Sequence, residues 1–284
     1  MKDPKISLLI TIGPDKERQF EMSMQSLARQ SYDRKKIELV VLIDTFKSKR
    51  LVGTVRKYKH IFSQTRVFLV KKKNGQVSHS ASRRNFLAIR SRGEYILFSE
   101  PEMVHVTDTI DLIFSFIRTN PKRCWYCGPV YATNSVVDKK GNIAVDKFSG
   151  IEDVNSLLGK IKDHPIDLND SDLKKHFFRI DENKYKPLFF CTLLNKKFFM
   201  ELQGLNQNLV VRGWEELEFF SRFGKVGGSI YFDQNFVTIH LPHKRSLNLI
   251  EQAGWNLFNS TVIFNKRQRI GELSERIVKL KVNG

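Results

Sequence analysis

The feature that most constrains the fold is the alternation of short apolar runs with segments of helical periodicity. Residues 6–12 and 37–43 are dominated by Ile, Leu and Val, and residues 95–98 form a third run of β type. Apolar runs of this length that do not alternate with polar residues are typical of parallel strands, which are covered on both faces. These three segments therefore predict the buried centre of a parallel sheet.

The segments between and after these runs continue the same rhythm. Helices are expected around residues 20–27, after Asp44, over 81–92, around 110–117 and after 195, and further strands over 66–70, 125–131 and 237–239. The polar segment 134–187, with a hairpin turn at D-K-K-G-N, is interpreted as an excursion over the active face. This order predicts an α/β fold with a Rossmann-like, mostly parallel sheet and helices on both faces.

Two carboxylates, Glu100 and Glu102, follow directly after the run 95–98. Open α/β sheets bind their ligands at the carboxyl ends of their strands. Two carboxylates at such a place can hold a hard divalent cation and, through it, the phosphates of a nucleotide. An E-x-E alone is most often solvated surface, so the position after a strand carries this prediction.

A second acidic group opens the helix expected from Trp214. On that helix Glu215 and Glu218 share one face at i, i+3, while Glu216 points elsewhere. Acidic residues in a first helical turn are also ordinary partners of the helix dipole. For any one of these glutamates alone, the dipole interpretation is the stronger one.

His240 stands at the end of the strand expected over 237–239, and His243 follows three residues later. A lone histidine in such a place is more often a hydrogen-bonded core or surface residue. Here it could supply an imidazole to the cation held by Glu102.

Taken together, these segments resemble the GT-A glycosyltransferases, specifically the large inverting family 2, with a second half similar to galactosyltransferases and chondroitin polymerases. The resemblance covers roughly residues 5–245. It is carried by G-Q-V-S at 75–78, S-R-R-N at 82–85, G-E-Y-I-L-F-S-E-P-E at 93–102, G-L-N at 204–206, G-W-E-E-L-E at 213–218 and a strand ending at His240. Each motif is weak alone, but their order and spacing are fairly specific.

The chain departs from the family's pattern at three places. Glu100-Pro101-Glu102 stands where the family has D-x-D, and Glu215-Glu216 stands where it has E-D. The first strand ends in T-I-G-P instead of P-x-Y-N. Glutamate can also bind a metal or accept a proton, with its carboxylate one methylene further out.

The resemblance implies a nucleotide-binding role for four residues. Thr11 and Asp44, at the ends of the first two strands, would hold the base and the ribose. Arg84 would contact the nucleotide, and Glu100 would face the ribose.

The resemblance also implies the metal and catalytic residues. Glu102 would bind the Mn²⁺ or Mg²⁺ that bridges the donor's diphosphate, with His240 (less readily His243) completing the site. Glu216 would be the general base that takes a proton from the acceptor hydroxyl. Trp214 and Glu215 would form the wall against the sugar and the acceptor.

The function expected from this resemblance is that of a hexosyl- or N-acetylhexosaminyltransferase. It would move a sugar from a nucleotide-diphosphate sugar, with UDP-sugar preferred, to a hydroxyl of a glycan, glycolipid or glycoprotein, with inversion. Polysaccharide biosynthesis is the expected context. The alternative is a catalytically inactive GT-A module that holds an anionic polymer or partner on its basic surface.

The expected organisation is a GT-A domain over residues 1–245 and a basic helical extension over 246–284. The nucleotide-binding half spans about 1–132 and the acceptor-binding, catalytic half about 133–245. Apolar residues at 270, 273, 277 and 280, with basic residues among them, predict an amphipathic helix. It would pack on the domain or a second subunit, or dock on an anionic membrane, and packing is slightly preferred.

The formal net charge of +18 implies polyanionic ligands or surfaces. No nucleic-acid-binding motif is present, so nucleic acid is not the expected partner. No apolar run is long enough to span a membrane, no signal peptide is seen, and three cysteines fit a reducing compartment. The expected location is the cytoplasm, with peripheral contact at the inner face of the membrane left open. The C-x-x-C at 124–127 reads as part of a core strand, with a metal or redox role the minor alternative.

Overall fold

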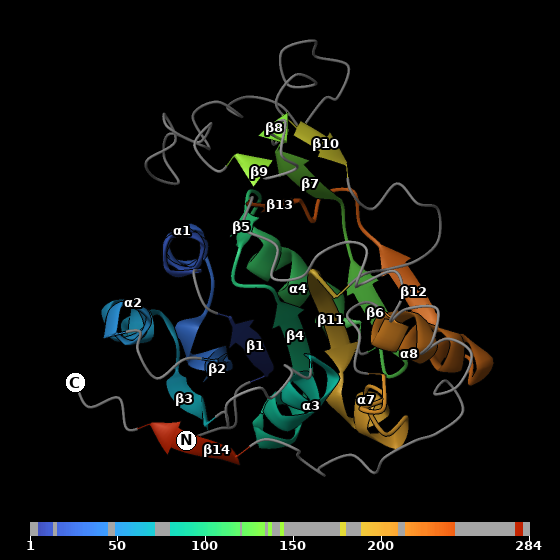
Figure 1. The fold of residues 1–284 in the computed structure, drawn as a ribbon. Helices are drawn as coiled ribbons and strands as arrows, with labels where there is room; N and C mark the ends of the chain where they lie inside the picture. The colour runs from blue at the N-terminus through green and yellow to red at the C-terminus, as the bar shows by residue number, and fades with distance from the viewer. Residues whose placement is uncertain are drawn as a thin grey trace.

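A computed structural model describes residues 5–13, 16–44, 49–71, 80–119, 121–133, 136–137, 143–144, 177–179, 189–209, 214–241 and 276–280. The strands of its main sheet are β1 (Ile6–Ile12), β2 (Ile37–Ile43), β3 (Gln64–Lys71), β4 (Tyr95–Ser99), β6 (Cys124–Cys127), β11 (Cys191–Asn195), β12 (Ser229–Phe232) and β14 (Arg276–Leu280). Within the described residues these eight strands follow the order β12-β6-β11-β4-β1-β2-β3-β14 (Figure 1). The central strands β4, β1, β2 and β3 are mutually parallel.

Helices cover both faces of this sheet. They are α1 (Glu17–Ala28), α2 (Lys49–Tyr58), α3 (Ser80–Arg90), α4 (Thr109–Arg118), α7 (Lys196–Glu201) and α8 (Trp214–Lys225), with short 3₁₀ turns η1 (Arg34–Lys36) and η2 (Lys59–Ile61). Apolar residues of α1, α2 and α4 pack on one face. Those of α3, α7 and α8 pack on the other.

The two faces are filled by alternate residues of the same strands. Leu8 and Ile10 of β1 belong to the core under α1, whereas Leu9 belongs to the core under α3. All three are at most 1% exposed, and burying such a side chain contributes about 1.5–3 kcal/mol. The predicted α/β fold with a mostly parallel sheet is confirmed. Its central strands need not alternate apolar and polar residues, because helices cover them on both faces.

A smaller sheet lies beyond the carboxyl end of β4 (Figure 1). Its order is β10 (Phe177–Arg179), β7 (Val130–Thr133), β13 (Thr238–His240) and β5 (Met103–His105). The short strands β8 (Val136–Val137) and β9 (Ile143–Ala144) pair antiparallel. This pairing agrees with the hairpin predicted around D-K-K-G-N, whose turn lies outside the described residues.

Gly93, in the G-E-Y-I segment, lies where the chain passes from α3 into β4. A Cβ atom at this position would come within 2.6 Å of Ser7 N and Oγ. Instead, Gly93 N donates a hydrogen bond of 2.7 Å to Ser7 Oγ. Only glycine permits this approach to β1. The contact fixes the start of β4 and therefore where Glu100 and Glu102 leave the sheet.

The single strand predicted over 125–131 is wrong. The chain divides there into β6 of the main sheet and β7 of the smaller one. Gly128 lies at the division, and a Cβ atom there would come within 2.2 Å of Phe236 O. The close approach of the segment that contains Phe236 interrupts the strand. The apolar pattern of residues 125–131 does not indicate this contact.

The predicted C-terminal helix is also wrong over Arg276–Leu280. This segment is β14, which pairs antiparallel with β3, Ile277 opposite Val70 and Lys279 opposite Phe68. An edge strand has unpaired backbone groups, and pairing with it satisfies both segments. The rest of the predicted extension, 246–275 and 281–284, lies outside the described residues. None of the described helices is long and apolar enough to cross a membrane.

Candidate functional site

The predicted site residues gather at the carboxyl edge of the parallel strands. Thr11 is the last residue but one of β1, and Asp44 follows β2 directly, its N–H donating to Ile12 O at 2.8 Å. Glu100 follows β4, and its N–H donates to Phe190 O at 2.9 Å. Side chains that are distant in sequence thus meet at one edge, where α/β sheets bind ligands.

Asp44 is held by a residue that the sequence interpretation gave no role. Arg83 of α3 donates from Nη1 and Nη2 to the two carboxylate oxygens of Asp44, at 2.7 and 2.9 Å. Both side chains are nearly buried, at 6% and 5% exposure. This bidentate geometry fixes the Asp44 carboxylate at the end of β2. The S-R-R-N motif contains Arg83, but only the fold decides which of its two arginines faces β2.

Arg84 lies among three glutamates that come from two distant parts of the sequence. Its Nη1 is 2.7 Å from Glu216 Oε1 and 3.6 Å from Glu215 Oε1. Its Nη2 donates to Glu100 Oε1. We call these four residues the Arg84 cluster. It joins α3 and the end of β4 to α8.

The electrostatics of the Arg84 cluster follow from its burial. Burial alone would lower the pKa of the Arg84 guanidinium, but the carboxylates of Glu100, Glu216 and Glu215 raise the pKa above its ordinary value. Arg84 therefore remains a cation and compensates the carboxylates, which are otherwise costly to bury. Its guanidinium also lies 5.5 Å from the centre of the Phe189 ring.

The two ends of α8's acidic face serve different purposes. Glu216 is 7% exposed, and its Oε2 accepts a hydrogen bond of 3.2 Å from Phe189 N. Glu218 pairs with Arg222 of the same helix at 2.6 Å, and Arg222 also donates to Gly204 O at 2.7 Å. The structure thus groups Glu215 with Glu216, and not with Glu218 as the i, i+3 spacing suggested, because Arg84 reaches both residues of the first turn.

Glu102 belongs to a separate group. Its Oε1 is 2.7 Å from Lys16 Nζ and 3.5 Å from His240 Nε2. The pairing of β5 with β13 sets Met103 opposite His240 and so brings the histidine to Glu102. Glu102 is 1% exposed, whereas the Lys16 and His240 side chains are 12% and 15% exposed. We call these three residues the Glu102 cluster.

The Glu102 cluster contains two side chains that could bind a divalent cation. Glu102 and His240 offer an oxygen and a nitrogen that converge, but the described residues contain no group of three His, Cys, Asp or Glu able to hold a metal. Mg²⁺ sites typically combine one or two carboxylates with substrate phosphates and water. Of the described residues, Glu102 and His240 thus offer two ligands, a number typical of ions whose remaining ligands are water or substrate oxygens.

Three further residues or segments selected from the sequence lie wholly or partly outside the described residues. Trp214 begins α8, but its side chain lies outside the described part, as do His243 and the segment 75–78.

In the C-x-x-C motif, Cys124 and Cys127 are buried in β6 and neither forms a disulfide. Burial raises the pKa of the Cys124 thiol to about 11. A protonated, buried thiol is a poor nucleophile and metal ligand, so the core-strand interpretation is the better one.

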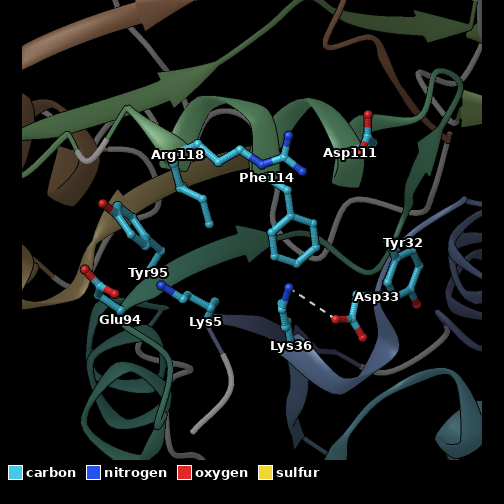
Figure 2. A pocket seen from close by; sticks show the side chains of 10 residues that line it. Lys5, Tyr32, Asp33, Lys36, Glu94, Tyr95, Asp111, Phe114 and Arg118 are labelled. Carbon is cyan, nitrogen blue, oxygen red and sulfur yellow. Dashed lines mark ion pairs between the residues drawn. The ribbon is translucent and has the colours of Figure 1, made fainter. Parts of the chain in front are cut away.

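A pocket of about 530 Å³ lies at the opposite edge of the sheet (Figure 2). Lys5, Lys36 and Tyr95 line it at the amino ends of β1, β2 and β4, and α4 covers it with Phe114 and Arg118. Lys36 is paired with Asp33 at 3.3 Å. Because ligands of open α/β sheets bind at the other edge, this pocket is not the predicted nucleotide site.

Comparison with solved structures identifies the fold. S. aureus TarS in complex with UDP-GlcNAc matches with a TM-score of 0.58 and 12% identity, covering 85% of this chain and 60% of that chain. The Pyrobaculum calidifontis mannosyltransferase PcManGT, in complex with GDP-Man and Mn²⁺, matches with a TM-score of 0.52 and 13% identity, covering 94% and 67%. GalNAc-T7 with UDP, GalNAc and Mn²⁺ matches with a TM-score of 0.56 and 11% identity, covering 85% and 44%.

These likenesses define the class of fold to which the chain belongs. Its α/β architecture with a mostly parallel mixed sheet is the GT-A fold of glycosyltransferases. The chain spans 60% of the TarS fragment and less than half of GalNAc-T7. No protein-family model matches the sequence, and no curated protein matches it.

Proposed function

We propose that the protein is an inverting glycosyltransferase that uses a nucleotide-diphosphate sugar. The observation that carries this proposal is the convergence of Asp44, Glu100, Glu102 and Glu216 at the carboxyl edge of a GT-A sheet. A scaffold alone does not imply activity, because function depends on the site. The proposal is supported by the position of these acidic residues at the carboxyl ends of the strands, the edge where open α/β sheets bind ligands.

The donor is proposed to be a UDP-sugar. Two of the similar structures, those of TarS and GalNAc-T7, hold UDP or UDP-GlcNAc, whereas PcManGT holds GDP-Man. Thr11 and Asp44 would meet the base and ribose, and Glu100 would face the ribose. Arg84 would act on the nucleotide through Glu100, because three carboxylates already surround its guanidinium.

Glu102 and His240 are proposed to hold a Mn²⁺ or Mg²⁺ ion together with the diphosphate. The ion would supply neutralisation of the charge on the leaving nucleoside diphosphate. Both PcManGT and GalNAc-T7 are solved with Mn²⁺. The protein's own contribution is to hold Glu102 in place. Leu241, directly after β13, donates its backbone N–H to the backbone carbonyl of Glu102 at 2.9 Å.

Glu216 is the proposed general base. A sugar hydroxyl is a poor nucleophile near neutral pH, so a positioned carboxylate must accept its proton. The two oxygens of Glu216 each accept one hydrogen bond, from Arg84 and from Phe189 N. A carboxylate offers about four acceptor sites, so each oxygen can accept one more donor. Trp214 and Glu215, beside it on α8, would line the sugar and acceptor wall.

The second candidate is a non-catalytic GT-A module that binds an anionic polymer or partner. The observation that favours it is the hydrogen bond of 2.7 Å from Arg84 to Glu216, which gives Glu216 a structural role in the Arg84 cluster. The net charge of +18 would suit an anionic partner.

For the enzyme, the acceptor is proposed to be a glycan or lipid-linked hydroxyl, with the chain in the cytoplasm and in peripheral contact with the membrane.

One experiment separates these candidates. The protein is incubated with UDP- and GDP-sugars in the presence of Mn²⁺, and thermal shift and release of nucleoside diphosphate are measured. The enzyme proposal expects a stabilising shift with at least one donor and release that rises with acceptor. A donor-dependent shift without release would favour the non-catalytic module. The absence of both across the panel would contradict the proposed nucleotide-sugar site itself.

A further inference from the structure

Lys16, like Arg83, is a residue of the site that no sequence pattern marks out. It is one of 48 lysines and arginines, in the link between β1 and α1. In the structure its Nζ lies 2.7 Å from Glu102 Oε1, although 86 residues separate them. The ammonium thus contacts a carboxylate oxygen of Glu102, the proposed metal ligand.

We propose that Lys16 is a diphosphate-binding residue, which allows the protein to bind a nucleoside diphosphate without a divalent cation. This inference rests on the proposed function. It adds a protein cation to the metal expected at the Glu102 cluster. Its consequence is that donor binding and metal binding are separable.

The first argument is the charge of Glu102. A carboxylate that is 1% exposed needs a cationic or hydrogen-bonding partner, since an isolated buried charge is very costly. In a metal-dependent site the ion supplies that partner. Lys16 Nζ, at 2.7 Å from Glu102 Oε1, supplies a cationic partner from the protein itself.

The second argument is the position of Lys16 relative to the other cations at this edge. Arg83 makes two bonds to Asp44, and Arg84 is shared by three carboxylates, each guanidinium side chain being 6% exposed. Lys16 is 12% exposed and lies directly before the amino end of the 12-residue helix α1. A helix amino end favours anions, and lysine binds phosphate as a compact point charge. Of these three described cations, Lys16 is therefore the best placed to meet phosphate.

The third argument concerns the state with metal bound. A divalent ion held by Glu102 and the Lys16 ammonium would repel each other, since both are positively charged. The diphosphate would then be the nearest new anion at this edge. Lys16 consequently contributes to nucleotide binding with metal as well, although less than in its absence because the ion carries part of the charge.

The test is titration calorimetry of the full chain with UDP, in excess EDTA and in Mn²⁺. Wild type, Lys16→Met, Lys16→Arg and the control Lys57→Met are compared. Lys57 forms a similar 3.0 Å ion pair with a glutamate, Glu21, but on the outer surface, with 58% exposure. Its replacement removes the same charge away from the site. Thermal unfolding of each variant confirms that it is folded.

Wild type is expected to bind UDP in EDTA, and Lys16→Met to bind it about 10- to 100-fold more weakly there, as for loss of a charge-assisted hydrogen bond. Lys16→Arg and Lys57→Met should stay within a few-fold of wild type. Mn²⁺ should reduce the deficit of Lys16→Met. Binding by wild type in Mn²⁺ but not in EDTA would overturn this inference and leave the proposed function standing. Equal affinity of Lys16→Met and wild type in EDTA would also overturn it, and no binding in either condition would overturn both.

Discussion

Glu100 and Glu102 are separated by one proline, yet the fold gives them to two different clusters. Glu100 enters the Arg84 cluster, whose side chains are at most 11% exposed and come from α3, the end of β4 and α8. Glu102 enters the Glu102 cluster, in which both partners are more exposed than the carboxylate. The first cluster is a closed joint and the second is open toward the ligand edge. The two carboxylates of one E-x-E motif can thus have different cationic partners and differently exposed surroundings.

The largest effect is expected for Glu216→Gln, which asks whether the closed cluster also performs chemistry. The amide keeps the shape but cannot accept a proton as the carboxylate does. Turnover should fall about 10²–10⁴-fold with nucleotide affinity nearly unchanged. Glu201→Gln, on the exposed surface of α7, is the control. Near-normal turnover of a folded Glu216→Gln protein would remove Glu216 from the chemistry and move the proposed base to Glu215 or Glu218.

The next effect is expected for Arg84→Met, which breaks the joint. Three buried carboxylates would lose their shared cation, and removing one partner of a buried ion pair typically costs about 3–5 kcal/mol. Urea unfolding should show this loss, while Arg50→Met, whose arginine is 67% exposed and 4.0 Å from Glu21, should change stability little. A loss below about 1 kcal/mol would mean that the cluster is not a joint.

A third prediction uses His105, three residues after Glu102 on β5. Burial lowers its pKa from 6.5 to about 4, so the fold holds it neutral, with Nδ1 2.8 Å from Thr109 Oγ1. Because the folded pKa is depressed, this contribution to stability is present above pH 6.5 and is lost as the pH falls through 4. The loss should reach about 3 kcal/mol between pH 7 and pH 4.

His105→Asn provides the comparison, since asparagine keeps a hydrogen-bonding group near Nδ1 and does not titrate in this range. On acidification the unfolding free energy of wild type should fall by that amount relative to that of His105→Asn. Parallel curves for the two proteins would show that β5 does not hold His105 neutral, and the Glu102 side of the site would then be more open than the structure indicates.

The smallest effect is expected for the stability of Lys16→Met. The buried Glu102 carboxylate would keep His240 but lose the ammonium, at a cost of about 1–3 kcal/mol. Mn²⁺ should restore much of this loss, because the ion takes over as the cation. Arg84→Met should show no such recovery. Rescue of both variants by Mn²⁺, or of neither, would remove the distinction between an open and a closed cluster.

Much of the fold is predictable from the sequence. The strands predicted over 6–12 and 37–43 are confirmed residue for residue, and β4 extends the predicted 95–98 by Ser99. The helices predicted around 20–27, 81–92 and 110–117 are confirmed within a few residues. The two errors, over 125–131 and 276–280, both arise where a distant segment decides the outcome: Phe236 crosses at Gly128, and β3 recruits β14.

The candidate site is predictable only in part. The sequence alone indicated which carboxylates stand at strand ends and at the start of α8, because a strand's end is a local property. It did not indicate their partners. Lys16 meets Glu102 across 86 residues, Arg83 meets Asp44 across 39 and Arg84 meets Glu216 across 132.

The sequence by itself determined the elements and the edge at which its acidic residues gather, because burial on both faces of a parallel sheet imposes an apolar pattern within each strand. Only the tertiary structure decided which cation compensates which carboxylate. Any of 48 basic residues could have served, and the pairing follows from how α1, α3 and α8 pack on the sheet. That packing made Glu100 part of a closed joint and left Glu102, with Lys16, at the open edge.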